Sequence, residues 1–460
     1  MRNFFPALEA VQDEPRPLIS LEEEMLLIDE NARDEARIQK DLGEVNRGID
    51  LADALEDLAV VAANVKDASV EETQLTEICG QMAAAGTDVA PEEIIPSMES
   101  FKDGTIATEN FKETAKKIWE SIQKFLAHVW DTIVNFFKRI FAQIPRARYR
   151  LEELKKQIKS IDKSKSKQKE GSHVGVFAVV AHKDVTDPAQ YIQANKTFTS
   201  IVDWVYSSYA KYVLAMGEKA KAGIEAFDAE DPQASANKLR YALQGVKLGR
   251  LPGVVSTKKV GQVETQSTDD LLHNKILIVS DLQKEGDVTT LGVLEKLRTH
   301  HVQLADSVGG RSMENGSGEV HKGKPLTVEQ MEEVVKELEA QLDAIEKFDK
   351  SKNEGDFQRV RKDLAAASKK AEKSLSDLDH SETSGHSKVV ETYYRAMLAF
   401  NAAFCHWINQ PLLQMTSLTL TNLRSGIARV QESIKCYDLE HVVQKERHGV
   451  PVPEHPLLPA

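Results

Sequence analysis

Residues 111–144 read FKETAKKIWESIQKFLAHVWDTIVNFFKRIFAQI. This stretch predicts one long amphipathic helix, because its apolar side chains recur at helical spacing without a break. They are Phe111, Ala115, Ile118, Trp119, Ile122, Phe125, Leu126, Val129, Trp130, Ile133, Val134, Phe137, Ile140, Phe141 and Ile144. Pro145 follows and is expected to stop or kink the helix, since proline has no amide hydrogen to donate. A wide apolar stripe of this kind needs a surface to cover it, so we expect a mainly α fold.

Three interpretations of this helix compete. Burial in a core or against a partner is the default for a wide stripe. The tryptophans and lysines would also suit a helix lying on a membrane surface. The basic run that follows, RARYRLEELKKQIKSIDKSKSKQK, could contact DNA phosphates or another anionic surface without sequence specificity. Its candidate contact residues are Arg146, Arg148, Arg150, Lys155, Lys156 and Lys159. We interpret residues 162–172 as a hinge.

Charge divides the chain after Glu99. Residues 1–99 hold 24 acidic and 7 basic side chains, a net charge of −17, whereas residues 100–460 have a net charge of +4. The acidic part contains a predicted helix start at Ser20 and a short coiled-coil seam that requires a partner helix. The seam consists of Ile38, Leu42, Val45, Ile49 and Ala52. Residues 80–100, rich in Gly, Pro and acids, read as an exposed linker.

The remainder of the chain predicts a helical bundle with a small β element. Asp187 and Pro188 have the pattern of an N-cap and first helical residue. Valines among Gly and Thr at 253–282, with KILIVSD, predict short strands. Helical patterns follow at 328–345, 357–378 and 389–437. We therefore divide the chain into an acidic helical segment with linker (1–99), a long amphipathic and basic helical region (100–172) and a mainly helical body (173–460).

No enzymatic constellation stands out. Gly318, Gly323 and Lys324 match the start of a phosphate-binding loop, but Pro325 occupies the position of the magnesium-binding Ser or Thr. A loop leading to a helix capped by Thr327 is the simpler interpretation. We interpret the adjacent pair His300–His301 as solvated and the pair Cys405–His406 as part of the core. The three cysteines, Cys79, Cys405 and Cys436, are expected to be free thiols. We expect neither an enzyme nor a bound metal or cofactor, and no stretch has the length of a membrane-spanning helix.

The layout of acidic helical segment, linker and Trp- and Lys-rich helix (FKETAKKIWESIQKFLAHVWDTIVNFFKRIFAQIPRARYRLEELKKQ) resembles the internal head, or inner body, proteins of phiKZ-like giant myoviruses. The resemblance implies a structural protein of the capsid interior, assembled in the host cytoplasm. It also implies that a prohead protease removes the acidic segment as a propeptide, after a small residue, any residue and Glu. Ser97, Met98 and Glu99 match at the charge boundary, so cleavage is expected between Glu99 and Ser100.

The tripeptide also matches at Ala7–Glu9, Ala54–Glu56, Ser69–Glu71, Ala90–Glu92 and Ala107–Glu109. A protease needs an extended, accessible substrate, which favours a linker match and leaves cleavage after Glu92 as the alternative. The implied partners are the prohead protease, other capsid core proteins and packaged DNA. We expected the seam to offer assembly contacts, which cleavage would remove together with the acidic charge. The alternative function is a membrane-active or DNA-associated effector ejected into the host with the genome.

Overall fold

The computed structural model describes residues 33, 36–52, 108–161, 171–174, 187–260, 263–269, 271, 275–281, 289–298, 302–306, 320–350, 353–376 and 385–437. Five sequence predictions lie wholly or mostly outside these residues. They are the helix start at Ser20, the linker at 80–100, the tripeptide at 97–99 with Ser100, the hinge at 162–172 and the histidines at 300–301.

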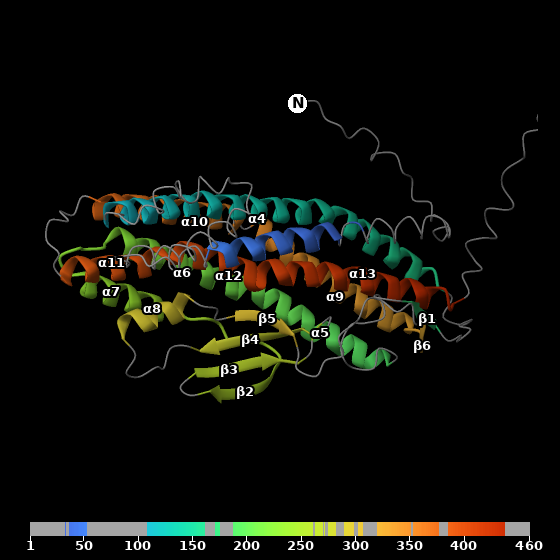
Figure 1. Cartoon of the computed structure of the whole chain (residues 1–460). Coiled ribbons are helices and arrows are strands. Elements are labelled where there is room, and N and C mark those ends of the chain that lie inside the picture. The colour runs from blue at the N-terminus through green and yellow to red at the C-terminus, as the bar shows by residue number, and fades with distance from the viewer. Residues whose placement is uncertain are drawn as a thin grey trace, which may run out of the picture.

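The described helices form an elongated bundle with a small sheet on one flank (Figure 1), so the mainly α prediction is confirmed. The helical elements are 36–52, α4 (Thr108–Lys159), α5 (Pro188–Trp204), η4 (Val205–Tyr209), α6 (Ala210–Glu225), α7 (Pro232–Gln244), α8 (Thr290–Arg298), α9 (Val328–Lys350), α10 (Asn353–Ser376), α11 (Gly385–Leu398), α12 (Phe400–Trp407), η6 (Ile408–Leu413) and α13 (Gln414–Ile434). The π-helical segment η4 joins α5 to α6, so they form one continuous rod. Helix α9 packs against α4, α5 and α13.

Helix α4 does not stop at Pro145 but runs to Lys159. The expected stop is therefore wrong, although proline in a helix interior costs about 3 kcal/mol. The apolar period continues beyond the proline, with Leu151, Leu154 and Ile158 all buried. Burial of a large apolar side chain stabilises by about 1.5–3 kcal/mol, so these side chains together outweigh the missing hydrogen bond.

The core is centred on rings from several helices. Phe348 of α9 lies 5.6 Å from Phe137 of α4 and 5.9 Å from Phe357 of α10, measured between ring centroids. Phe404 of α12 contacts Phe357 at 6.0 Å and Trp130 of α4 at 6.4 Å. Trp130 is 3% exposed, so the burial interpretation of α4 is confirmed for the described side chains from Leu126 onward.

The N-termini of α5 and α9 follow local rules. The Asp187 carboxylate accepts a hydrogen bond from the Ala189 amide at 3.0 Å, which confirms the predicted N-cap of α5. Thr327 and Gln330 exchange backbone and side-chain hydrogen bonds of 2.9 and 3.3 Å at the start of α9. The Gly318–Lys324 stretch therefore leads to a capped helix. Its partial match to a phosphate-binding loop is not needed to explain why a helix begins there.

The predicted β element is an antiparallel sheet of order β2-β3-β4-β5. Its strands are β2 (Val254–Val260), β3 (Val263–Thr268), β4 (Lys275–Asp281) and β5 (Val302–Asp306). The Leu304 amide donates to the side chain of Gln410 at 3.2 Å, which ties β5 to η6. A second pair, β1 (Gly171–Val174) with β6 (Val320–Gly323), was not predicted, because four-residue strands 150 positions apart leave no hairpin signal.

The predicted helix at 389–437 is interrupted. Gln410 has extended backbone angles (φ −108°, ψ 117°) inside η6, immediately before Pro411. A residue that precedes proline is pushed away from helical angles by the proline ring. The chain therefore turns there and leaves α13 as a separate helix, of which most residues are buried.

Candidate functional site

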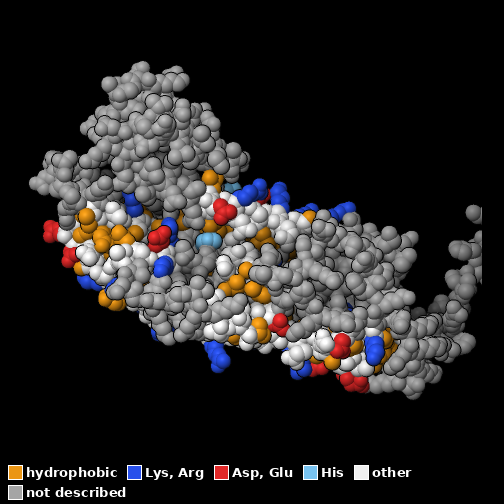
Figure 2. Space-filling model, turned by 60° about the horizontal axis from the view of Figure 1, so that its bottom comes forward, with side chains coloured by type: hydrophobic (Ala, Val, Ile, Leu, Met, Phe, Trp, Pro, Cys, Tyr) orange, Lys and Arg blue, Asp and Glu red, His pale blue; other side chains and the backbone are white. Residues whose placement is uncertain are grey.

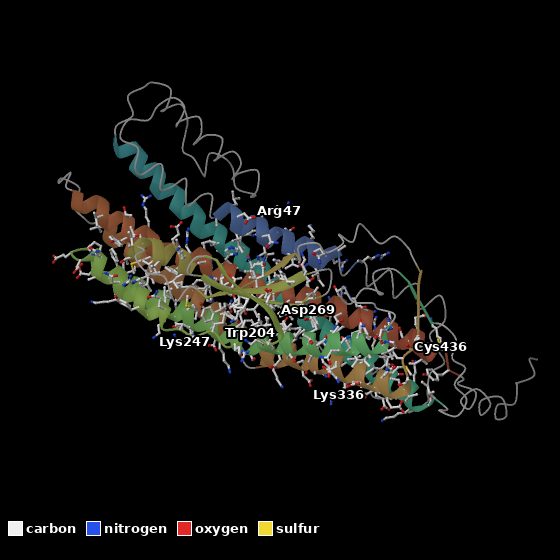
Figure 3. The ribbon with its side chains drawn as sticks, turned by 90° about the horizontal axis from the view of Figure 1, so that it is seen from below. Arg47, Trp204, Lys247, Asp269, Lys336 and Cys436 are labelled. Carbon is white, nitrogen blue, oxygen red and sulfur yellow. The ribbon has the colours of Figure 1, made fainter. Side chains whose placement is uncertain are left out.

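The coiled-coil seam of the acidic segment lies against the body of the same chain. Helix 36–52 runs alongside α4 in both ribbon views (Figures 1 and 3), with α13 on its other side in Figure 1. Its five seam side chains, Ile38, Leu42, Val45, Ile49 and Ala52, are at most 7% exposed and belong to the same hydrophobic core as α4 and α13. The predicted partner for the seam exists, but it is this body and not another protein.

Polar contacts fix this helix on three elements of the body. The Arg139 guanidinium of α4 donates to the Asp41 carboxylate at 2.5 Å, and Asp41 is 6% exposed. Gln39 donates to the Ser417 hydroxyl of α13 at 3.3 Å. The Asn409 amide of η6 donates to Asn46 at 2.6 Å. Because hydrogen bonds require particular pairs of atoms, they set the register of the docked helix as well as its attachment.

Docking also accounts for why this short segment is helical. An isolated helix of about 12–15 residues is only marginally stable in water. Burial of each Val, Ile or Leu of the seam contributes about 1.5–3 kcal/mol. The outward face keeps charged side chains in solvent, including Arg47, which lies at the outer edge of the helix in Figure 3. The helix is therefore held by tertiary packing more than by its own propensity.

The basic run on α4 is partly neutralised by α9. Arg148 forms ion pairs with Asp343 and, at 3.0 Å, with Glu346, while Lys155 pairs with Glu339 and with Glu152 of its own helix. Residues 339, 343 and 346 are spaced by four and three, so they share one face of α9. Burial alone would lower the pKa of Arg148, but its acidic partners outweigh this and raise it. The pKa of Lys155 is raised chiefly by its hydrogen bond to Glu339.

The other predicted contact residues lie closer to solvent. Arg146, Lys156 and Lys159 are exposed and Arg150 is half-buried, while Lys156 pairs with Glu153 at 3.2 Å. The structure thus brings two of the six basic residues into the α4–α9 contact and leaves the outer ones at the surface. On the face shown in Figure 2, described acidic and basic side chains are interspersed, as expected for a body of small net charge.

A buried polar layer links α5, α9 and α13. The Asn422 amide donates to Asn195 at 3.0 Å and to Gln341 at 2.9 Å, and Gln341 donates to Thr199 at 3.1 Å. Asn195, Gln341 and Asn422 are at most 2% exposed. Directional bonds inside an apolar core specify which helices meet, because any other arrangement would leave these groups unpaired.

Two further buried groups carry no sign of catalysis. Burial raises the pKa of the Cys405 thiol to about 11, so the thiol is protonated at neutral pH and is a poor nucleophile. This agrees with the prediction of core packing. Arg429 is 2% exposed, with its guanidinium 4.7 Å from the centroid of the Tyr191 ring. Within the described ranges no group of His, Cys, Asp and Glu could hold a metal ion, and no helix could cross a membrane.

The sequence analysis did not identify the polar residues that hold helix 36–52 on the body. Asp41 stands beside the seam position Leu42, and Arg139 stands between the buried positions Phe137 and Ile140. A charge next to an apolar position on each of two helices is a weak signal. Only the fold pairs them, because they are 98 positions apart.

Comparison with known proteins gives one match. A family model described as phiKZ-like phage internal head proteins matches residues 22–410. The matched range includes helix 36–52 and extends through α4 to η6. No curated protein and no solved structure matches the chain.

Proposed function

This chain belongs to the phiKZ-like phage internal head proteins, and from that membership we propose that it is made as a precursor whose acidic propeptide is cut from the body between Glu99 and Ser100. The family places the protein in the interior of the phage capsid, as a structural component of the virion. The prohead protease and other capsid core proteins are the proposed partners during assembly in the host cytoplasm. Cleavage is the step that converts the assembly form into the packaged form.

The observation that carries the proposal is the charge boundary. The segment before the proposed cut has a net charge of −17 and the part after it +4. DNA is a dense array of phosphates, so a strongly anionic segment is repelled by it and a near-neutral body is not. Ser97, Met98 and Glu99 stand at this boundary. Cutting there would end the covalent link between the anionic segment and the near-neutral body.

The N-terminus of the protein in mature virions tests this proposal. We expect the virion form to begin at Ser100. In phage that encodes Glu99→Gln, the cut should be lost or moved, because the proposed protease recognises the carboxylate before the bond. Glu92→Gln is the matched control in the same linker and should leave the Ser100 terminus unchanged. Virions in which residues 1–99 remain joined to Ser100 would rule the proposal out.

The Glu92 alternative gives a different result in the same experiment. Cleavage after Glu92 would produce a terminus at Glu93, and Glu92→Gln would then be the variant that blocks processing. Mass spectrometry of the N-terminal peptide separates the two positions by seven residues. A terminus at Ser100 or at Glu93 would support a precursor. Only a terminus at Ser100 would support the proposed position.

A further inference from the structure

The docked helix and the rest of the acidic segment differ in charge. Helix 36–52 carries three basic and three acidic side chains, so its net charge is zero. Residues 1–35 hold 10 acids and 3 bases, and residues 53–99 hold 11 acids and 1 base. The net charge is therefore −7 for residues 1–35 and −10 for residues 53–99, so all of the negative excess lies before and after the docked helix. The part of the segment that binds the body has no electrostatic conflict with DNA.

We propose that helix 36–52 is a permanent element of the body, which stays bound without a covalent link after the chain is cut between the acidic segment and α4. The two anionic flanks remain attached to this helix after a single cut, and further cuts on both sides of the helix would be needed to remove them. This inference relies on the proposed cleavage for its place in maturation, but the binding itself does not depend on which enzyme cuts or where in the linker it cuts.

The contacts of the helix carry the proposal. Its apolar side chains are buried to the same degree as those of α4: Val45 and Ile133 are both 0% exposed. Asn409 is 1% exposed and donates to Asn46, so loss of the helix would leave a buried amide without this acceptor. Removal would also uncover the core beneath it. Apolar burial and an ion pair to the buried Asp41 carboxylate both disfavour dissociation.

Arg139 provides a test of this interface that leaves the apolar core intact. Its side chain is 51% exposed, whereas that of its partner Asp41 is 8% exposed. Arg139→Glu would place a second carboxylate against the buried one. Lys138 is the neighbouring residue on α4 and is exposed. Lys138→Glu therefore changes the charge equally at a site outside the interface and is the matched control.

The experiment uses the full-length chain with the recognition sequence of a site-specific protease inserted after Glu99. The folded protein is cut completely and then passed over a sizing column at micromolar concentration. We expect both fragments in one peak, with a denaturing gel showing two bands. After cutting, Arg139→Glu should release the N-terminal fragment at least about tenfold faster than the parent, because it removes the partner of the buried Asp41 carboxylate and places a like charge beside it. Lys138→Glu should match the parent.

Separate elution of the parent fragments would overturn the proposal. Equal dissociation rates for Arg139→Glu and Lys138→Glu would overturn the assigned contact. Circular dichroism of each uncut variant checks that it is folded. Because the inserted site is cut by an unrelated protease, co-elution can be established even if virions show no cleavage at Glu99, so the two proposals fail separately.

Discussion

Arg429 is a buried guanidinium in a helix where a medium-sized apolar side chain would fit the pattern. It is 2% exposed, and none of its three nitrogens has a hydrogen-bond partner among the residues that the structure describes. Burial lowers its pKa, with the Tyr191 side chain partly opposing this. For a base, a lowered folded-state pKa means that protonation at neutral pH opposes folding. The stacking on Tyr191 offsets part of this cost.

Replacement of this side chain by an apolar one of similar length should therefore stabilise the fold. We expect Arg429→Met to raise the free energy of unfolding by at least about 1 kcal/mol, measured by urea denaturation at pH 7. Arg359→Met is the control, because Arg359 is half-exposed and pairs with Glu218 at 2.7 Å. That variant should leave stability nearly unchanged, because solvent-exposed ion pairs contribute little. A destabilised Arg429→Met variant would contradict the prediction.

Individual side chains could be predicted where their partners are close in sequence. The capping roles of Asp187 and Thr327 follow from two- and three-residue spacings. The isolation of Arg429 and the pairing of Asp41 with Arg139 depend on helices that meet only in the folded chain. No local pattern encodes them.

Gly217 shows how closely two elements can approach. A Cβ atom built on this residue of α6 would lie 2.6 Å from side-chain carbons of both Phe404 and Val360. Such a separation is well inside van der Waals contact, and neither neighbour is free to move in a packed core. The absence of a side chain at 217 therefore allows α6 to meet α10 and α12.

A pair of glycine substitutions tests this packing. Gly217→Ala should destabilise the protein by about 1–3 kcal/mol because it overpacks the core. Gly355→Ala, in α10, meets nothing within 4 Å and should stabilise by up to about 1 kcal/mol through helix propensity alone. Thermal melting of both variants measures the difference. Equal shifts in Tm would show that the close approach at Gly217 does not matter.

Long periodic elements were predictable and their interruptions were less so. The apolar repeat identified α4, α9 and α10 because each buries one stripe along most of its length. At Pro145 the same rules allowed a stop or a kink, and the stop is wrong because packing outweighs the local penalty. They also missed the break at Gln410, although Pro411 is the residue that accounts for it.

For the whole molecule, sequence patterns predicted the correct class and the correct family, but not the docking of helix 36–52 on the body of its own chain. Periodicity shows that a seam needs a partner and cannot say which surface provides it. The same holds for the basic run. Its composition suggests an anionic ligand, whereas α9 supplies carboxylates for Arg148 and Lys155 within the chain.

Two lysines one helical turn apart can distinguish basic side chains that pair within the chain from those that could contact DNA. Lys155 pairs with Glu339, and Lys159 is exposed at the end of α4. If the cut protein binds duplex DNA, Lys159→Ala should reduce the slope of log affinity against log salt by about 0.9, the value for one phosphate contact. Lys155→Ala should leave the slope unchanged. Fluorescence anisotropy with a labelled duplex over a range of salt measures both, and equal effects would contradict the prediction.

The hydrogen bond between Gln39 and Ser417 joins positions 378 residues apart. A ribosome adds about 5–20 residues per second, so roughly 20–75 s pass between synthesis of the one and of the other. During that interval α4 is made, but α13 is not. Docking of the first helix can therefore be completed only after Ser417 has been synthesised.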